Sequence, residues 1–101
     1  MAVDKLSGKQ RRHLRALGQA LAATLHVGHD GVTDAVVRQA DVLLDAHELI
    51  KVRVSENAPA SRHDVADELA ARTKAHLAQV LGRTALLYRG RKEEPAIVLP
   101  A

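Results

Sequence analysis

The residues of this chain most suited to binding a ligand are two glycines three positions apart. The segments around them carry cations. The stretch VGHDGVT places Gly28 and Gly31 on either side of His29 and Asp30. Because glycine lacks a Cβ and readily takes positive φ, a Gly-x-x-Gly turn lets backbone N–H groups approach a phosphate. Thr33 suits the N-cap of a helix, whose free N–H groups would lie just beyond the loop. The spacing fits a phosphate contact, and it also fits an ordinary tight connection.

Cations gather in two parts of the sequence and acids in a third, although the net charge is only +3. Residues 1–15 hold five cations against Asp4 alone: Lys5, Lys9, Arg11, Arg12 and Arg15. Residues 72–92 hold six cations and no acid: Arg72, Lys74, Arg83, Arg89, Arg91 and Lys92. Residues 30–48 reverse the sign, with five acids against Arg38: Asp30, Asp34, Asp41, Asp45 and Glu48. The distribution predicts one basic and one acidic side, and the basic side suits a polyanion.

The other polar residues do not form a catalytic pattern. Ser7, Ser55 and Ser61 stand at helix caps or in loops, and the carboxylates gather on predicted helix surfaces. The glycine loop lacks the further glycine and the Lys-Ser/Thr pair of nucleotide-binding loops. We therefore expect no enzyme, no catalytic residue and no cofactor.

Six histidines raise the question of a metal site. His26 and His29 are three positions apart and, with Asp30, could share an ion. A zinc site needs further ligands, however, and the chain has no cysteine. We expect scattered structural histidines, with His47 packed near the end of a helix, and no metal site.

Composition indicates a single domain spanning residues 1–101. Hydrophobic residues make up 47% of the chain, but Tyr88 is its only aromatic residue, so the core must consist of Leu, Val, Ile and Ala. No apolar run approaches the roughly 20 residues that span a bilayer, and the N-terminus lacks the apolar centre of a signal peptide. With no cysteine, these features predict a cytoplasmic protein with no membrane partner.

Capping residues and apolar periodicity place the first elements. Ser7 and Gln10 form a capping box for a helix with a buried stripe, Leu14, Leu17 and Leu21, opposite its cations, Lys9, Arg11, Arg12 and Arg15. A strand follows at residues 22–27. Thr33 then caps a second helix with a buried stripe, Val36, Ala40, Leu43, Leu44 and His47, and a solvent-exposed face, Asp34, Arg38, Asp41, Asp45 and Glu48. Residues 49–54 alternate as a half-buried strand with Lys51 and Arg53 on its second face.

The second half predicts one helix and a hairpin. Ser61 and Asp64 form a capping box for a helix that runs to Thr73 and buries its apolar face, Val65, Ala66 and Leu69. Strands at 76–81 and 84–89 flank a turn at Gly82 and Arg83. After them, GRKEEP is predicted to be a mobile segment that leaves the sheet, and AIVL (96–99) could add an edge strand. The order α-β-α-β-α-β-β predicts an α/β fold: a single compact layered domain with a mixed four-stranded sheet.

Four stretches together resemble a known family: LSGKQRRHLRALG, VGHDGVT, HELIKVRV and VLGRTALLYR. In this order and spacing they are similar to the CRM domain, named for chloroplast RNA splicing and ribosome maturation, in its single-domain bacterial YhbY-like form. The resemblance covers about residues 5–99. It implies a compact α/β fold similar to the C-terminal domain of a bacterial translation initiation factor. It also implies RNA binding, linked to precursors of the large ribosomal subunit.

The resemblance implies an RNA-binding set of eleven residues: Gly28, His29, Asp30, Gly31, Lys9, Arg12, Arg15, Lys51, Arg53, Arg83 and Arg89. Asp30 would repel a phosphate placed beside it. Contacts should therefore come from backbone N–H groups and from His29, with Asp30 either turned away or capping the start of the second helix.

Two functional hypotheses follow. The first is a monomeric RNA-binding module that docks on ribosomal RNA during assembly of the large subunit, with phosphate contacts supplying most of the affinity. The second is a protein-interaction adaptor, in which the acidic second helix contacts a basic ribosomal protein or assembly factor.

Overall fold

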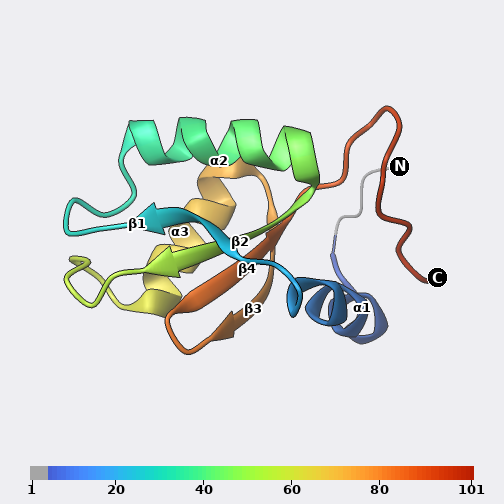
Figure 1. Cartoon of the computed structure of the whole chain (residues 1–101), viewed down its shortest axis with the longest axis horizontal. Coiled ribbons are helices and arrows are strands. Elements are labelled where there is room, and N and C mark those ends of the chain that lie inside the picture. The colour runs from blue at the N-terminus through green and yellow to red at the C-terminus, as the bar shows by residue number, and fades with distance from the viewer. Residues whose placement is uncertain (1–4) are drawn as a thin grey trace.

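A mixed sheet carries helices on both of its faces in the computed structural model, which describes residues 5–101 (Figure 1). The elements are α1 (Gly8–Gly18), β1 (Ala23–Val27), α2 (Asp34–His47), β2 (Leu49–Val54), α3 (Arg62–Thr73), β3 (His76–Leu81) and β4 (Thr84–Tyr88). The four strands lie in the order β1-β2-β4-β3. β1 runs parallel to β2, whereas β4 is antiparallel to both β2 and β3. The α/β fold and its element order, expected from the sequence, are confirmed.

α2 and α3 cover one face of the sheet because β2 turns its branched residues toward them. Ile50, Val52 and Val54 are almost completely buried, and they share a cluster with Leu44 of α2 and Leu69 of α3. Side chains alternate between the two faces of a strand, so Lys51 and Arg53 lie on the opposite face. The alternation predicted for this strand is confirmed.

α1 packs across one end of that opposite face. Its N-terminus has the predicted capping box, in which Gln10 N donates to Ser7 Oγ (3.1 Å) and Ser7 N donates to Gln10 Oε1 (3.0 Å). Leu14 is fully buried, in a cluster with Leu49 and Leu86. α1 therefore covers only the part of this face that adjoins the start of β2.

The buried stripe predicted for the first helix is wrong for Leu17 and Leu21, which are 41% and 37% exposed. The reason is Gly18, where the helix ends against the sheet: a Cβ built there would lie 2.8 Å from Leu86 Cδ2. Leu21 then follows in the connection to β1 and does not continue the helical stripe.

The end of α2 also departs from the prediction. His47 was expected to be buried and Glu48 exposed, but His47 is exposed and Glu48 is fully buried. α2 ends at His47, and Glu48 takes a φ of +64°, outside the helix, so the helical periodicity no longer applies to it.

The buried Glu48 carboxylate anchors the C-terminal segment. It accepts hydrogen bonds from three backbone N–H groups, those of Arg91 (2.8 Å), Ala96 (2.6 Å) and Ile97 (2.9 Å). Residues 96–99 form no strand, so the expectation of an edge strand there is wrong. Within GRKEEP, Arg91 is hydrogen-bonded to Glu48. Within residues 5–101, none of the helices combines the length and the hydropathy that a membrane crossing requires.

Candidate functional site

Three connections meet at one edge of the sheet, at the left of Figure 1. β1 and β2 are parallel, so the loop after β1 and the loop at 55–61 both leave from this edge. The β3–β4 turn reaches the same edge, because Val54 N donates to Arg83 O (2.8 Å). In parallel sheets, the carboxyl ends of the strands are where ligands most often bind. We call this edge the loop edge.

The loop edge encloses an open hollow of about 390 Å³. Gly28, Arg53 and Arg83 line it together, so the structure gathers three of the predicted site residues. His26, Asn57 and the acidic Glu56 also line it, and none of the three was predicted. His26 is the register partner of Arg53, so both side chains lie on the sheet face opposite α2 and α3. Its position between two buried residues of β1 is the sequence signal that could have identified it.

The two loop glycines have different structural roles. Gly31 takes a φ of +72°, and a Cβ on it would lie 3.0 Å from Pro59 Cγ. Gly28 has no positive φ, and a Cβ there would meet no atom within 4 Å. A hydrogen bond from Gly31 N to Gly28 O (3.0 Å) closes the turn. The fold therefore requires glycine at position 31 and leaves position 28 open to solvent.

The tip of this loop presents free backbone donors. No backbone-to-backbone hydrogen bond within residues 5–101 uses the N–H of His29 or Asp30. Their side chains pair with each other (Nε2 to Oδ1, 3.3 Å) and are 80% and 74% exposed. Asp30 does not cap α2, because Thr33 Oγ1 accepts the hydrogen bond from Val36 N (3.1 Å). One of the two roles expected for Asp30 is therefore wrong.

Arg83 holds the β3–β4 turn against the end of β2. Its Nε donates to Val54 O (3.0 Å) and its Nη2 donates to Ser55 O (2.8 Å). The side chain is only half-buried, and it borders the hollow. Arg83 thus both positions the loop edge and adds positive charge to it.

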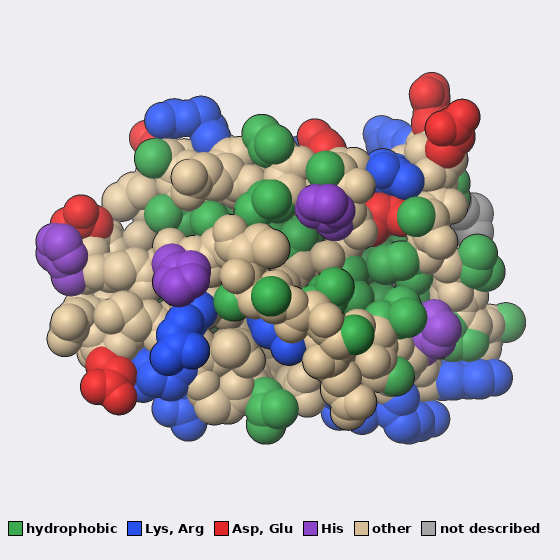
Figure 2. Space-filling view, in the orientation of Figure 1, with side chains coloured by type: hydrophobic (Ala, Val, Ile, Leu, Met, Phe, Trp, Pro, Cys, Tyr) green, Lys and Arg blue, Asp and Glu red, His purple; other side chains and the backbone are tan. Residues whose placement is uncertain are grey.

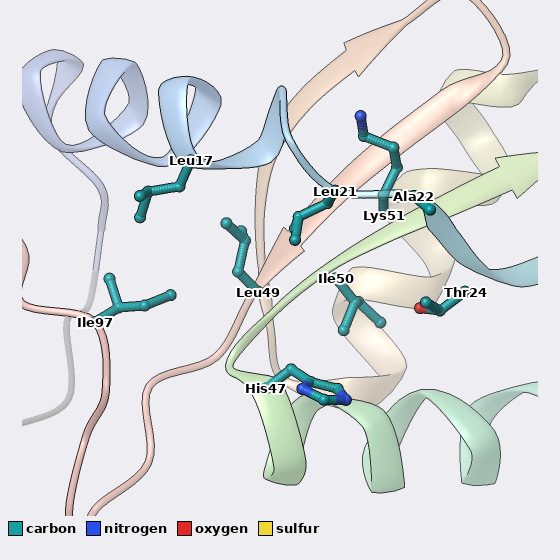
Figure 3. Close-up of a pocket in the computed structure, with 9 residues that line it drawn as sticks. All are labelled: Leu17, Leu21, Ala22, Thr24, His47, Leu49, Ile50, Lys51 and Ile97. Carbon is teal, nitrogen blue, oxygen red and sulfur yellow. The ribbon is translucent and has the colours of Figure 1, made fainter.

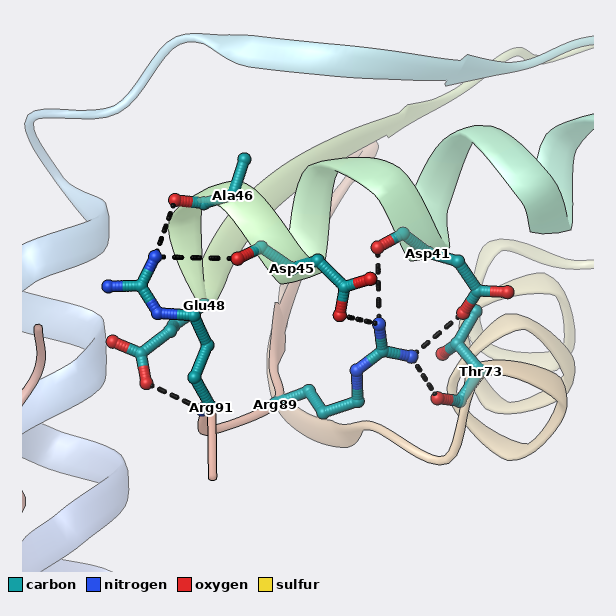
Figure 4. A network of polar contacts seen from close by, with 7 residues as sticks. All are labelled: Asp41, Asp45, Ala46, Glu48, Thr73, Arg89 and Arg91. Carbon is teal, nitrogen blue, oxygen red and sulfur yellow. Dashed lines mark hydrogen bonds and ion pairs between the residues drawn. The ribbon is translucent and has the colours of Figure 1, made fainter. Parts of the chain in front are cut away.

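Arg89 lies elsewhere. It follows β4, whose end adjoins the start of β2, at the opposite edge of the sheet. Its guanidinium donates to the carboxylates of Asp41 (2.8 Å) and Asp45 (2.9 Å) and to the carbonyl of Thr73 (2.7 Å) (Figure 4). The structure therefore does not bring Arg89 to the predicted site, because it joins β4 to α2 and α3.

The remaining predicted cations extend along the sheet face that α2 and α3 leave free. Arg53 is exposed and Lys51 half-buried on this face, where α1 also packs. Lys9, Arg12 and Arg15 are exposed on α1, at the other end of a molecule 38 Å long. Figure 2 shows Lys and Arg side chains over the left part and along the lower right of this view. We call this set, together with Arg83, the basic face.

The acids of α2 are mostly paired with arginines. Asp34 contacts Arg72 (2.6 Å), while Asp41 and Asp45 contact Arg89. The acidic side that the sequence predicted is thus largely neutralised within the fold. Among the described residues, no three His, Asp or Glu side chains are grouped closely enough to hold a metal ion.

Comparison with known proteins gives consistent matches over most of the chain. The profile of the CRS1 / YhbY (CRM) domain family matches residues 6–89. The chain is 40% identical over 95 residues to a protein of Bacillus subtilis named probable RNA-binding protein YqeI, covering 94% of this chain and 99% of that one. It is 33% identical over 84 residues to probable RNA-binding protein PA4753 of Pseudomonas aeruginosa, covering 83% and 81%.

A solved structure matches the fold. The solution structure of protein SAV1595 from Staphylococcus aureus superposes with a TM-score of 0.82 at 35% sequence identity. The match covers 95% of this chain and 100% of that one. The described elements therefore recur as a set in a protein of similar length.

Proposed function

The chain belongs to the CRS1 / YhbY (CRM) domain family, and from that premise we propose that it binds RNA through the loop edge and the basic face. Two of its relatives carry the name of RNA-binding proteins. The proposal includes no catalytic step and no cofactor. The protein would act as a monomer in the cytoplasm.

One observation supports the proposal most strongly: free backbone donors and two arginines meet at the loop edge. Gly28 lines the hollow together with Arg53 and Arg83, and the unpaired N–H groups of His29 and Asp30 follow it directly in the chain. Backbone N–H groups and guanidinium groups are strong donors to phosphate oxygens. A Gly-x-x-Gly loop clamps the backbone of single-stranded RNA in the KH modules by the same chemistry. With no Cβ at Gly28, an RNA backbone can come within contact distance of the loop.

The cations beyond the loop edge would extend the contact. Lys51 continues the line of Arg53 along β2, and Lys9, Arg12 and Arg15 lie on α1 at the far end of the long axis. An RNA strand that follows this face would meet several phosphate-binding groups in succession. Each such contact should add about −0.7 to the slope of log K against log salt for single-stranded RNA.

We extend the proposal to ribosomal RNA in a precursor of the large subunit, as the family resemblance implies. Stacking of bases on aromatic side chains would contribute little, since Tyr88, the only aromatic residue, is 5% exposed. Recognition would then depend mainly on the shape and the backbone of the RNA. An adaptor function of α2 has less support, because its Asp34, Asp41 and Asp45 carboxylates are paired internally.

The test is a filter-binding titration of RNA at several salt concentrations. The variant Lys51→Ala/Arg53→Ala should bind about 20-fold more weakly, since each lost phosphate contact is worth about 1 kcal/mol, or about fivefold. The control is Arg38→Ala/Arg62→Ala, which removes two exposed cations from α2 and α3. Salt-independent binding, or equal losses in the two variants, would refute the proposed surface.

The ribosomal part of the proposal needs a separate experiment. Crosslinking in cells, followed by sequencing of the bound RNA, should recover precursors of the large-subunit RNA. Recovery of other RNA classes only would remove the ribosomal assignment and leave RNA binding intact.

A further inference from the structure

A second hollow, of about 380 Å³, lies between α1, the end of α2, the start of β2 and the C-terminal segment (Figure 3). Leu49 of β2 lies at its centre among Leu17, Leu21 and Ile97, and Ile50 points to the side where His47 lies. We call it the apolar pocket. Its size falls in the range of small-ligand sites, which begins at about 300 Å³.

The pocket exists because two elements stop short of it. β1 begins at Ala23, which pairs with Lys51, so β1 does not cover Leu49 and Ile50. α1 ends at Gly18 and leaves Leu17 partly exposed at the rim. Leu49 and Ile50 are only 5% and 2% exposed, whereas Leu17 and Leu21 at the rim are 41% and 37% exposed. A mostly apolar hollow with a few polar groups is the usual form of a ligand site.

The lining of the pocket suits an anionic partner that carries an apolar group. Among the described residues that line it, the polar side chains are Thr24, His47 and Lys51, and none is acidic. Lys51 belongs to both the pocket and the basic face, so an RNA strand that follows Arg53 and Lys51 reaches the rim of the pocket. The exposed imidazole of His47 lies at the rim, from the end of α2 (Figure 3).

We propose that the apolar pocket takes up one unpaired nucleobase of the bound RNA. This inference rests on the proposed function. The sugar-phosphate backbone lies over Lys51, the base enters between Leu17 and Leu21, and its polar edge meets His47 and Thr24. The chain has no Phe or Trp and its Tyr88 is buried, so an apolar pocket is the alternative to stacking on a large aromatic ring. RNA with an unpaired base near the phosphate contacts then binds better than a continuous duplex.

The experiment compares strands with and without bases by fluorescence anisotropy. The probes are oligouridylate and oligoadenylate of about ten nucleotides and an abasic ribose-phosphate strand of the same length and charge. The full chain should bind at least one base-containing strand about tenfold more tightly than the abasic strand. Leu17→Gln/Leu21→Gln should bind all three with the affinity of the abasic strand.

Two further variants make the result specific. Val42→Gln replaces an exposed apolar residue of α2 outside the pocket and should behave as the unchanged chain. Ala22→Leu fills the pocket without removing an apolar residue and should also abolish the preference for bases, which guards against a folding defect in the double variant.

The outcomes separate this inference from the proposed function. Equal affinity of the unchanged chain for all three strands overturns the base pocket, as does a preference that survives both pocket variants.

Loss of binding in Lys51→Ala/Arg53→Ala would still support the RNA-binding surface in either case. Absence of RNA binding by the unchanged chain would overturn the proposed function itself. A dimer in sedimentation that Leu17→Gln/Leu21→Gln dissociates would assign the pocket to a second copy and overturn the base pocket.

Discussion

Gly28 and Gly31 show at the residue scale how a fold and a contact surface place separate demands on one loop. Gly31 is fixed by its positive φ and by its contact with Pro59. Gly28 has neither constraint, so a side chain there would clash only with a ligand that approaches the loop. A substitution at position 28 should therefore affect RNA binding and not stability, and a substitution at position 31 should affect stability.

Gly28→Ala should leave the free energy of unfolding unchanged and weaken RNA binding by about fivefold, the loss of one backbone hydrogen bond worth about 1 kcal/mol. Gly31→Ala should destabilise the fold by about 1 to 2 kcal/mol, the cost of a left-handed conformation for a residue with a Cβ. Urea unfolding and filter binding measure the two effects. If Gly28→Ala binds RNA like the unchanged chain, the backbone of this loop does not contact phosphate.

Glu48 carries the clearest pH dependence among the described residues. Burial raises the pKa of its carboxyl, but the N–H groups of Arg91, Ile97 and Ala96 and the charge of Arg91 more than offset this and lower it. A lowered folded-state pKa contributes stability above the pKa of an unfolded glutamate, about 4.3, and that stability is lost as the pH falls through the folded value.

Glu48→Gln should therefore cost about 2 kcal/mol at neutral pH, and the difference from the unchanged chain should shrink below about pH 4. Urea unfolding of both proteins between neutral and acidic pH measures this difference. Glu56→Gln, at an exposed position, is the control and should unfold like the unchanged chain. A constant difference at all pH values would show that the charge of Glu48 does not stabilise the C-terminal segment.

Helical periodicity predicted a buried His47 and an exposed Glu48, and it could not have predicted the observed reverse. Periodicity holds only while the helix continues, and α2 ends one residue before Glu48. A glutamate at positive φ has no local sequence signal, because its stabilising partners are backbone groups more than forty positions away.

At the scale of elements, Arg89 joins one strand, β4, to two helices, α2 and α3. Its guanidinium links the end of β4 to the acids of α2 and to the last residue of α3, Thr73. This network gives Arg89 a structural role away from the loop edge, and it pairs Asp41 and Asp45 of α2.

Arg89→Ala should lower the free energy of unfolding by about 2 kcal/mol, because several charge-assisted hydrogen bonds are lost together. Its affinity for RNA, measured under conditions where it is folded, should equal that of the unchanged chain. Arg53→Ala should show the reverse pattern, with unchanged stability and weaker binding. A folded Arg89→Ala variant with impaired RNA binding would restore Arg89 to the contact surface.

The starts of the helices were predictable, whereas parts of their buried faces were not. Ser7, Thr33 and Ser61 each accept the expected capping hydrogen bond, since this interaction spans only three residues. The exposure of Leu17 and Leu21 depends on where Gly18 meets Leu86, a contact between distant segments. Local chemistry is visible in one sequence, and long-range packing is not.

At the scale of the whole molecule, the basic face has two separated ends. The loop edge lies at one end of a 38 Å axis and α1 lies at the other. The type of fold and the order of its elements followed from the sequence pattern. The separation did not, because no local pattern reports that α1 packs beside the start of β2.

The length of the RNA should therefore decide which cations contribute to its affinity. A strand of about four nucleotides, the length that a Gly-x-x-Gly loop clamps, should bind Arg12→Ala/Arg15→Ala and the unchanged chain equally. A strand of about twelve nucleotides, within the range of single-strand sites, should bind that variant about 20-fold more weakly. Calorimetric titration with both strands measures this, and equal losses for the two lengths would mean that α1 adjoins the loop edge in the complex.

The anchored C-terminal segment has a topological consequence. It returns to the first helix, where Gln10 Nε2 donates to Pro100 O (3.1 Å), so early and late parts of the polypeptide are adjacent. A short glycine-serine linker could join the segments before and after this contact, and a new opening could be cut in an exposed loop. Opened at residues 19–22, between α1 and β1, such a circular permutant would retain the sheet and its loop edge, because this exposed connection lies outside both.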